Sequence, residues 1–265
     1  MCKARLWGGE NYKAISDQAE LVEAREWLQA LPGAVLCGRS GLAGSLNGDL
    51  HGFLQTVFLC SPEVARSIGK RALDRRFPVH ALLLKQGDRA GSTFLLAAGR
   101  AHALTYGLEG QMVLLREFLP GDFFGAIALA EPAPEDADVV AIEDVRAAVF
   151  LALDFLGLIE TYGCVGLVVS QALLKQLRAA SAKMLERSTL SAAGRVHAEL
   201  LRLARLGDGR TVRPIPVLSA LAVRVQSTRE TVSRTISALE RRGILRRDDD
   251  ALFIVAPQRL EEMIV

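Results

Sequence analysis

The sequence Ser-Thr-Arg-Glu-Thr-Val-Ser-Arg-Thr-Ile-Ser-Ala-Leu-Glu-Arg-Arg-Gly, from Ser227 to Gly243, has the pattern of an amphipathic helix. Val232, Ile236 and Leu239 recur at i, i+4 and i+7, so they form one apolar stripe that requires a core behind it. The side chains directed away from this stripe are mostly charged. Glu230, Arg234 and Arg241 lie on the opposite face, and Arg229 and Ser233 lie on the flank in the first two turns.

Both ends of this helix carry sequence signals. Thr228 or Ser227 can cap the N-terminus, and Ser227 with Glu230 also fits a capping box. Gly243 is suited to end the helix, because glycine adopts the left-handed conformation that follows a last helical turn. We therefore expect a helix that begins near Arg229 and ends before Gly243.

Positive charge is concentrated around this helix. From Arg224 to Arg247 there are seven arginines and two glutamates, whereas the whole chain has a formal net charge of +2. A short helix at about 217–225, a tight turn and a second helix with Arg and Glu in its first turn are typical of a helix-turn-helix that reads the major groove. A solvated, arginine-rich surface helix is the alternative. A β-hairpin follows, with strands at 244–247 and 251–255, and this wing favours the DNA-binding interpretation.

The segment from about 217 to 255 resembles the winged helix-turn-helix of the cyclic-AMP receptor protein and FNR (CRP/FNR) family of bacterial regulators. The family's hallmark Arg-Glu-Thr-Val-x-Arg occurs here at residues 229–234. The resemblance covers roughly residues 70–258. It implies an α+β fold: an N-terminal cyclic-nucleotide-binding-like β-roll (a double-stranded β-helix or jelly roll), a long dimerisation helix and a C-terminal winged helix-turn-helix.

On this basis we expect four segments. They are an N-terminal extension of unknown role (1–52), a sensor domain (53–160), a dimerisation helix with a hinge (161–190) and a DNA-binding domain (191–265).

The resemblance also assigns DNA contacts, and the chemistry of the side chains agrees with them. Arg229 and Arg234 can each donate two hydrogen bonds to guanine, and Glu230 can accept one from cytosine. Relatives with this triplet read half-sites like TGTGA, while Ser233 is shared with FNR-like members that read TTGA-type half-sites. Phosphate contacts, which position the protein and carry the salt dependence, are assigned to a second set. Its members are Thr228, Thr231, Arg241, Arg246 and Arg247.

Upstream, the sequence changes to short apolar runs separated by turn signals, which indicates a β-barrel-like sandwich. The expected strands are 81–84, 93–97, 101–105, 111–115, 139–142 and 147–151. Residues 53–77 read as one or two short helices, with Ser61 as a cap and Val64, Ile68 and Leu73 facing inward. The resemblance makes the strands a cyclic-nucleotide-binding β-roll.

The ligand pocket departs from the family pattern, which is Gly-Glu-(Leu/Ile)-(Ala/Gly)-Leu followed by Arg-(Ser/Thr)-Ala. Here the first stretch is Gly125-Ala126-Ile127-Ala128. Ala126 replaces the Glu that accepts from the ribose, Asp136 replaces the phosphate-binding Arg, and Ala137 replaces the hydroxyl residue. Removing one charge-assisted partner costs about 1.5–3 kcal/mol, and reversing its sign costs more. We predict that cyclic AMP does not bind and that no cofactor is present.

The sequence leaves several other ligands of the roll as alternatives. Haem would need an axial histidine, and the available ones are His51, His80, His102 and His197. A cyclic di-nucleotide, another anion, a protein partner or no ligand at all are the remaining alternatives.

The N-terminal 50 residues are not explained by the resemblance. Residues 17–31 predict an amphipathic helix, and the glycine-rich stretch 33–52 predicts no regular structure. The alternatives for this extension are an arm that covers the sensor or dimer seam, a mobile extension, or a start site chosen too far upstream.

A long helix is expected from about 163 to 187. Its apolar face recurs at roughly heptad spacing, which indicates a two-fold dimer seam; a helix buried within its own domain is the alternative. The seam residues are Val165, Val169, Ala172, Leu173, Leu177, Ala180 and Met184. Ser191 is expected to cap the next helix, 192–206, so that 188–191 forms a hinge.

Several classes of protein are disfavoured. The four cysteines form no Cys-x-x-Cys pair, so neither a zinc site nor a disulfide framework is expected. They also lack the N-terminal cluster that holds an iron–sulfur centre in FNR-like members, so the resemblance implies no such centre here. The sequence shows no signal peptide, no membrane span and no catalytic residues at a recognisable spacing. We therefore expect a cytoplasmic protein that is not an enzyme. The resemblance implies double-stranded DNA, a second copy of the chain and RNA polymerase as partners. A sensor that binds DNA only with another ligand bound is the alternative, and a nucleotide-dependent enzyme regulator without DNA binding is a rival.

Overall fold

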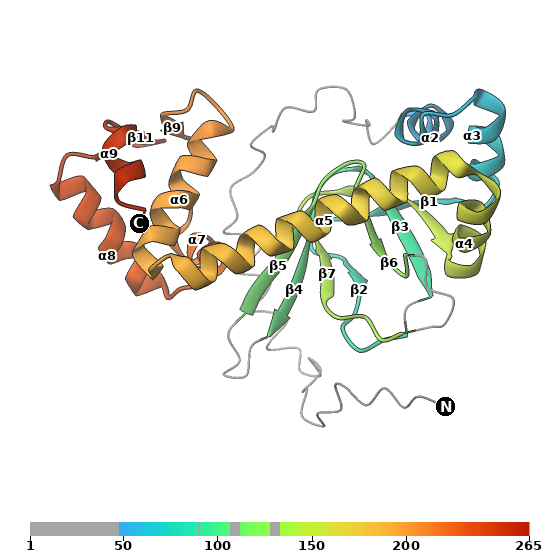
Figure 1. The fold of residues 1–265 in the computed structure, drawn as a ribbon, viewed down its shortest axis with the longest axis horizontal. Coiled ribbons are helices and arrows are strands. Elements are labelled where there is room, and N and C mark those ends of the chain that lie inside the picture. The colour runs from blue at the N-terminus through green and yellow to red at the C-terminus, as the bar shows by residue number, and fades with distance from the viewer. Residues whose placement is uncertain (1–47, 90, 107–111, 128–132, 265) are drawn as a thin grey trace.

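The computed structural model describes residues 48–264, apart from 90, 107–111 and 128–132. The helix predicted at 17–31 and two of the four cysteines therefore lie outside the described residues. Two domains are joined by one long helix, α5 (Figure 1). We refer to the elements from α2 to α4 as the N-terminal domain and to those from α6 to α9 as the C-terminal domain.

Two short helices, α2 (Leu50–Phe58) and α3 (Pro62–Gly69), open the N-terminal domain. Asp49 caps α2, and Ser61 caps α3 as predicted, by accepting from the backbone N–H of Val64. The start of α2 at Leu50 corrects the expectation that the glycine-rich stretch has no regular structure up to residue 52, because a capped helix with buried Leu54 begins there. The expectation for Leu73 is also wrong: it lies in a strand and is 53% exposed.

Eight strands of the N-terminal domain form two four-stranded sheets, with the orders β1-β8-β3-β6 and β2-β7-β4-β5, and neighbouring strands are antiparallel. The strands are β1 (Leu73–Phe77), β2 (Leu82–Leu84), β3 (Ser92–Ala98), β4 (Ala101–Tyr106), β5 (Met112–Phe118), β6 (Phe123–Gly125), β7 (Asp138–Ala141) and β8 (Val145–Leu151). Six of them match the predicted runs. The sequence interpretation missed β1, which was assigned to helix, and β6, where no strand was predicted.

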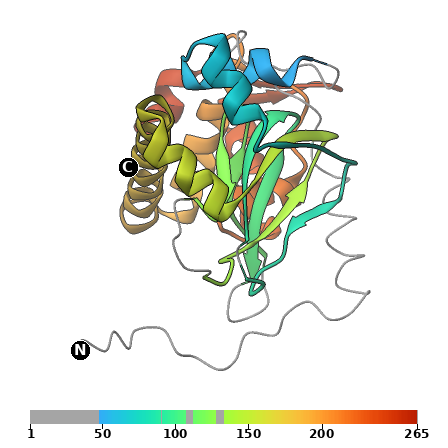
Figure 2. The ribbon, with the colours of Figure 1, turned by 90° about the vertical axis from the view of Figure 1, so that its right-hand side faces the viewer.

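Strand β3 is apolar on both faces because each face is covered. Phe94 and Leu96 join the cluster between the two sheets, while Leu95 faces the helices with Phe123 and Phe150. Alternate side chains of a strand point to opposite faces, so the same strand supplies two cores. Helices α2 to α4 and the beginning of α5 cover the outer face, and Figure 2 shows α4 and α5 at one side of the strands.

Helix α4 (Ala152–Thr161) is followed by α5 (Gly163–Thr189), which runs from the roll to the C-terminal domain (Figure 1). Helix α5 confirms the predicted long helix, but two residues of the proposed seam do not face the surface. Val165 and Val169 are 0% and 4% exposed and pack into the core of their own domain, so they cannot be surface residues of a dimer seam. The apolar periodicity continues from this buried segment into the exposed one, and the pattern alone could not separate them.

The C-terminal domain contains the predicted helix-turn-helix and wing. Its elements are α6 (Ala192–Arg205), β9 (Thr211–Val212), α7 (Leu218–Val225), α8 (Arg229–Arg241), β10 (Leu245–Arg247), β11 (Leu252–Ile254) and α9 (Pro257–Glu262). Val232, Ile236 and Leu239 of α8 are buried in one core with α6, α7 and the wing, as the stripe predicted. Strand β9 extends the hairpin to a three-stranded sheet, which the sequence interpretation missed.

Across the described ranges, no single helix has both the length and the apolar composition needed to cross a membrane. Helices α4 and α5 meet those criteria only as a pair, and they are bent by 113° where they meet.

Candidate nucleic-acid interface and sensor pocket

Helix α8 is held at its N-terminus by Thr228. The Oγ1 atom of Thr228 accepts from the backbone N–H of Thr231 at 3.1 Å. Thr228, rather than Ser227, is therefore the cap, and the capping box between Ser227 and Glu230 is not formed. The carboxylate of Glu230 is instead ion-paired with Arg234, one helical turn later.

The turn before α8 is fixed by an arginine that the sequence interpretation did not single out. Arg195 of α6 donates to the carbonyl oxygens of Val225 (2.9 Å) and Gln226 (3.3 Å) in the turn. It also donates to the carbonyl oxygen of Leu190 (3.0 Å), and Leu190 is the C-cap of α5. One guanidinium thus joins the long helix to the helix-turn-helix. An arginine in an amphipathic helix gives no sequence signal for such a role.

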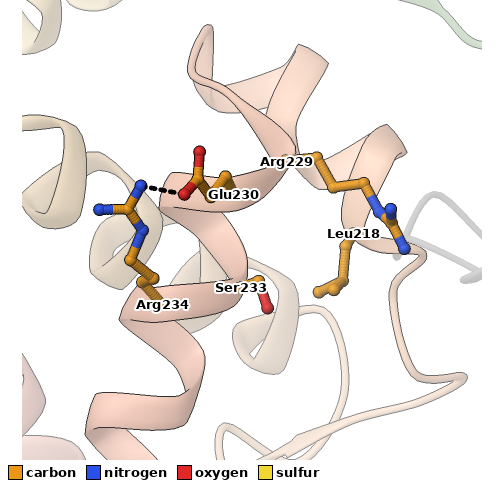
Figure 3. Close-up of a pocket in the computed structure, with 5 residues that line it drawn as sticks. All are labelled: Leu218, Arg229, Glu230, Ser233 and Arg234. Carbon is orange, nitrogen blue, oxygen red and sulfur yellow. Dashed lines mark ion pairs between the residues drawn. The ribbon is translucent and has the colours of Figure 1, made fainter.

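The base-contact candidates line one shallow surface depression together with Leu218 of α7 (Figure 3). In Figure 3, Arg229 extends on the side of Leu218, while Glu230 and Arg234 form an ion pair on the other side and Ser233 lies between. The Glu230 and Arg234 side chains are both 71% exposed. Because the apolar face of α8 is buried, this polar face is the part of the helix that a ligand can reach.

The candidates for phosphate contacts lie at the beginning of α8 and after it. Thr228 and Thr231 face each other, with 2.9 Å between their hydroxyl oxygens. Arg241 and the wing arginines are exposed. Arg246 lies over the ring of Phe253 at 5.0 Å, and the Nε atom of Arg247 is 3.0 Å from a carboxylate oxygen of Glu240.

The residues at the positions that bind the ligand in relatives fix the backbone conformation of the roll. Gly125 has a φ of +84°, and a Cβ atom there would lie 2.4 Å from the carbonyl oxygen of Ser92. Ala126 is fully buried; its N–H donates to Ser92, and its carbonyl accepts from the hydroxyl of Thr93 at 2.8 Å. Ile127 is partly buried against the helices, and Ala128 lies outside the described residues.

These residues do not fit a ribose and a cyclic phosphate. Ala126 offers no side-chain acceptor, and Ala137 is a buried core residue. Asp136 is exposed and brings a carboxylate to the position where the phosphate needs a cation. Next to it, burial and the charge of Asp136 raise the pKa of Glu135. The local chemistry is acidic, which is unfavourable for an anion.

The described histidines have distinct surroundings. His51 lies beside Asp49, His102 is fully buried beside Glu117, and Nδ1 of His197 is 3.1 Å from the carbonyl oxygen of Met263. Within the described ranges, no three His, Cys, Asp or Glu side chains gather into a metal-binding group.

Two regions of the chain match models of known protein families. Residues 74–162 match the cyclic nucleotide-binding domain, and residues 194–263 match the Crp-like helix-turn-helix domain. The cyclic AMP receptor protein of Thermus thermophilus is 30% identical over 193 residues, which cover 71% of this chain and 87% of that protein. The chain belongs to the CRP/FNR family of transcription regulators. It is therefore a DNA-binding regulator of the CRP/FNR type rather than an enzyme, with a domain suited to a small ligand.

Another relative and two solved structures are also similar to this chain. The CRP-like cAMP-activated global transcriptional regulator of Mycobacterium tuberculosis is 23% identical over 204 residues, 75% of this chain and 91% of that protein. The c-di-GMP responsive regulator CLP of Xanthomonas campestris has a TM-score of 0.65 at 17% identity, covering 74% of this chain and all of that one. A CooA mutant of Carboxydothermus hydrogenoformans also has a TM-score of 0.65, at 18% identity over 87% and 99% of the two chains. These structures confirm the α+β fold.

Proposed function

We propose that this regulator is a homodimer that binds a near-palindromic site of TGTGA-like or TTGA-like half-sites without control by cyclic AMP. Each copy places α8 in a major groove, and the two grooves are one helical turn apart. The observation that carries the proposal is the exposed polar face of α8, with Arg229, Glu230 and Arg234 on a helix whose other face is buried.

The chemistry of this face suits direct reading of bases. Arg229 can donate a fork to a guanine without giving up another partner of α8, because it extends away from the Glu230–Arg234 pair. Arg234 and Glu230 satisfy each other in the free protein. On DNA this pair can exchange its mutual contact for a guanine and a neighbouring cytosine. Both residues stay hydrogen-bonded in either state, so little charge is left unpaired.

The exposed half of α5 supports a dimer. Leu173, Leu177, Met184 and Leu185 are 42%, 64%, 75% and 63% exposed in the single chain. Large apolar side chains exposed along one helix mark an interaction surface. Ala172, Leu173, Leu177, Ala180 and Met184 remain in the proposed seam, to which we add Leu167, Leu174 and Leu185.

The pocket supports a regulator that does not respond to cyclic AMP. Ala126, Asp136 and Ala137 lack the acceptor, the cation and the hydroxyl that hold the nucleotide. The roll itself keeps both of its cores. That observation favours a second candidate, in which another ligand, such as a cyclic di-nucleotide, haem or a protein partner, is needed before DNA is bound.

The proposal is tested by fluorescence anisotropy of a palindromic TGTGA-type duplex and a TTGA-type duplex with the purified protein and no added ligand. We expect specific binding to one of the two, at least about 10³-fold tighter than to a scrambled duplex. Equal, weak and salt-sensitive binding to all three duplexes would reject the effector-free model and favour the second candidate.

Sedimentation equilibrium tests the dimer. Leu177→Glu places a charge on the exposed face of α5 and should give a monomer. Leu153→Glu is the matched control, because Leu153 is a comparably exposed leucine (71%) on α4. A dimeric Leu177→Glu variant would place the seam elsewhere.

A further inference from the structure

A cluster of charged side chains lies where the C-terminal domain touches the roll. At its centre is Glu117 of β5. Its Oε1 atom is 3.4 Å from Arg100, from the Nε2 atom of His102 and from Arg224. The Glu117 side chain is 23% exposed and that of His102 is 0% exposed.

Arg224 belongs to the other domain. It lies in the last turn of α7, the first helix of the helix-turn-helix, and α7 packs against β5. Its Nη2 atom is 3.4 and 3.5 Å from the two carboxylate oxygens of Glu117, and its Nη1 atom is 3.6 Å from Glu199 of α6. The two ends of one guanidinium therefore contact carboxylates of different domains.

The groups around Glu117 keep it charged. Burial alone would raise its pKa, but the hydrogen bond with His102 and the positive charges of Arg224 and Arg100 outweigh burial and lower the pKa to about 2. Ion pairs that are partly withdrawn from water are screened less by salt than exposed pairs. The contact between the domains is thus a persistent ion pair across the physiological pH range.

The same strand is also fastened to the long helix. Lys183 of α5 donates to the carbonyl oxygen of Leu115 in β5 at 3.0 Å. Strand β5 therefore contacts both the helix that carries the proposed dimer seam and the helix-turn-helix. The chain connection between these two parts is the short hinge at Leu190 and Ser191.

We propose that Glu117 and Arg224 form a latch that fixes the orientation of α8 relative to α5. Both are positioning residues, because they act through the placement of α8 and do not touch DNA. The latch makes the distance between the two α8 helices of a dimer depend on strand β5. The inference rests on the proposed dimeric function, since only a dimer reads two half-sites at a fixed spacing.

A panel of duplexes in which the spacer between the half-sites varies by single base pairs tests the latch. A rigid dimer discriminates strongly between spacers, and a loosened one does not. We expect Arg224→Gln and Glu117→Gln to reduce the ratio of best to worst affinity by about tenfold. Affinity for a duplex with a single half-site should stay within about twofold, because the polar face of α8 is unchanged. The effect of the double variant should be smaller than the sum of the two single effects, because both substitutions remove the contact between Glu117 and Arg224.

Glu143→Gln is the matched control. Glu143 is a carboxylate of the same cluster that pairs with Arg100 at 2.6 Å and not with the C-terminal domain. The substitution changes the net charge as Glu117→Gln does, and the spacer profile should stay that of the wild type. Unchanged profiles for Arg224→Gln and Glu117→Gln, or additive effects in the double variant, would overturn the latch.

Hydrogen exchange of the DNA-free protein separates failure of the latch from failure of the proposed function. Arg224→Gln should accelerate amide exchange at the hinge and in α7, relative to Glu143→Gln. If no variant or wild-type protein binds either half-site, the proposed function fails, and exchange still decides whether the latch exists. Equal exchange in the wild type and Arg224→Gln would refute it.

Discussion

The surface of α8 and the ligand pocket of the roll stand in contrast within one chain. On α8, the motif residues Arg229, Glu230 and Arg234 are exposed, on a helix whose apolar face, with Val232, is buried. In the roll, the positions that hold a cyclic nucleotide in relatives carry Ala126, Asp136 and Ala137. One chain therefore combines an exposed set of motif residues on α8 with a roll whose pocket positions differ from the family pattern.

This difference separates the requirements of packing from those of binding. Gly125 has a left-handed conformation, and the hydrogen bond from Thr93 to Ala126 holds the turn, although Ala126, Asp136 and Ala137 differ from the family pattern. Backbone geometry and core volume are set by stability, whereas ligand contacts are set by function. A family fold can therefore persist while its ligand chemistry changes.

The largest expected effect is on DNA binding. Arg229→Ala and Arg234→Ala should each weaken specific binding by about 1–3 kcal/mol, because each removes a two-pronged contact with a guanine. Anisotropy with the preferred duplex measures the loss. Arg259→Ala, which removes an exposed arginine from α9, is the control and should change little. If all three variants bind alike, bases are not read by α8.

A substitution in the roll should affect stability without affecting the DNA-reading face. Gly125→Ala forces an alanine into a φ of +84° with its Cβ atom 2.4 Å from a backbone oxygen. We expect a loss of about 1–3 kcal/mol in the free energy of unfolding, measured by urea denaturation. Gly87→Ala is a suitable comparison, since Gly87 has a similar φ of +83° but no atom within 4 Å of a Cβ. Equal losses in the two variants would show that the close approach to Ser92 has no cost.

Acidification should destabilise both domains through one buried histidine in each. Burial lowers the pKa of His102 in the roll and of His197 in α6, against the opposing effects of Glu117 and of the Met263 carbonyl. Below about pH 6.5 the unfolded chain therefore binds more protons than the folded one, and stability falls as the pH falls. Each histidine contributes at most about 1.4 kcal/mol per pH unit.

Urea midpoints at pH 7.5 and 5.5 measure this effect. His197→Asn should flatten the dependence in part, because the contribution of His102 remains. Glu117 acts at a lower pH: its folded pKa of about 2 lies below the value in an unfolded chain, so its stabilisation is lost only as the pH falls towards 2. A midpoint that does not change between pH 7.5 and 5.5 would contradict the assignment of both histidines.

The smallest expected effect concerns the cap of α8. Thr228→Ala should reduce the free energy of unfolding by about 1 kcal/mol, because the N–H of Thr231 loses its acceptor. Ser227→Ala should have almost no effect, since Ser227 is not the cap. Thermal unfolding measures the loss of stability in each variant. A larger loss for Ser227→Ala than for Thr228→Ala would show that Ser227 is the cap.

Sequence reasoning predicted those features that follow from local pattern. The stripe of Val232, Ile236 and Leu239, the cap at Ser61 and the wing were all recognisable, because each depends on residues near one another in the chain. Strand β1 was missed because its burial pattern is almost wholly exposed, and its pairing partner β8 lies about 70 residues later.

The contacts between the domains could not be predicted for the same physical reason. Glu117 and Arg224 are 107 positions apart, and Arg195 reaches residues from two other elements. Charged residues in amphipathic segments have the same pattern whether they face water or another domain. The split of α5 into a buried beginning, with Val165 and Val169, and an exposed remainder likewise depends on which elements cover it.

The central claim is that DNA reading is retained while the cyclic-AMP site is lost. The direct test is anisotropy of the preferred duplex with the dialysed protein, in the presence and absence of a saturating excess of cyclic AMP. We predict specific binding with the same Kd in both titrations. A Kd lowered tenfold or more by cyclic AMP, about 1.4 kcal/mol of coupling, would contradict the account.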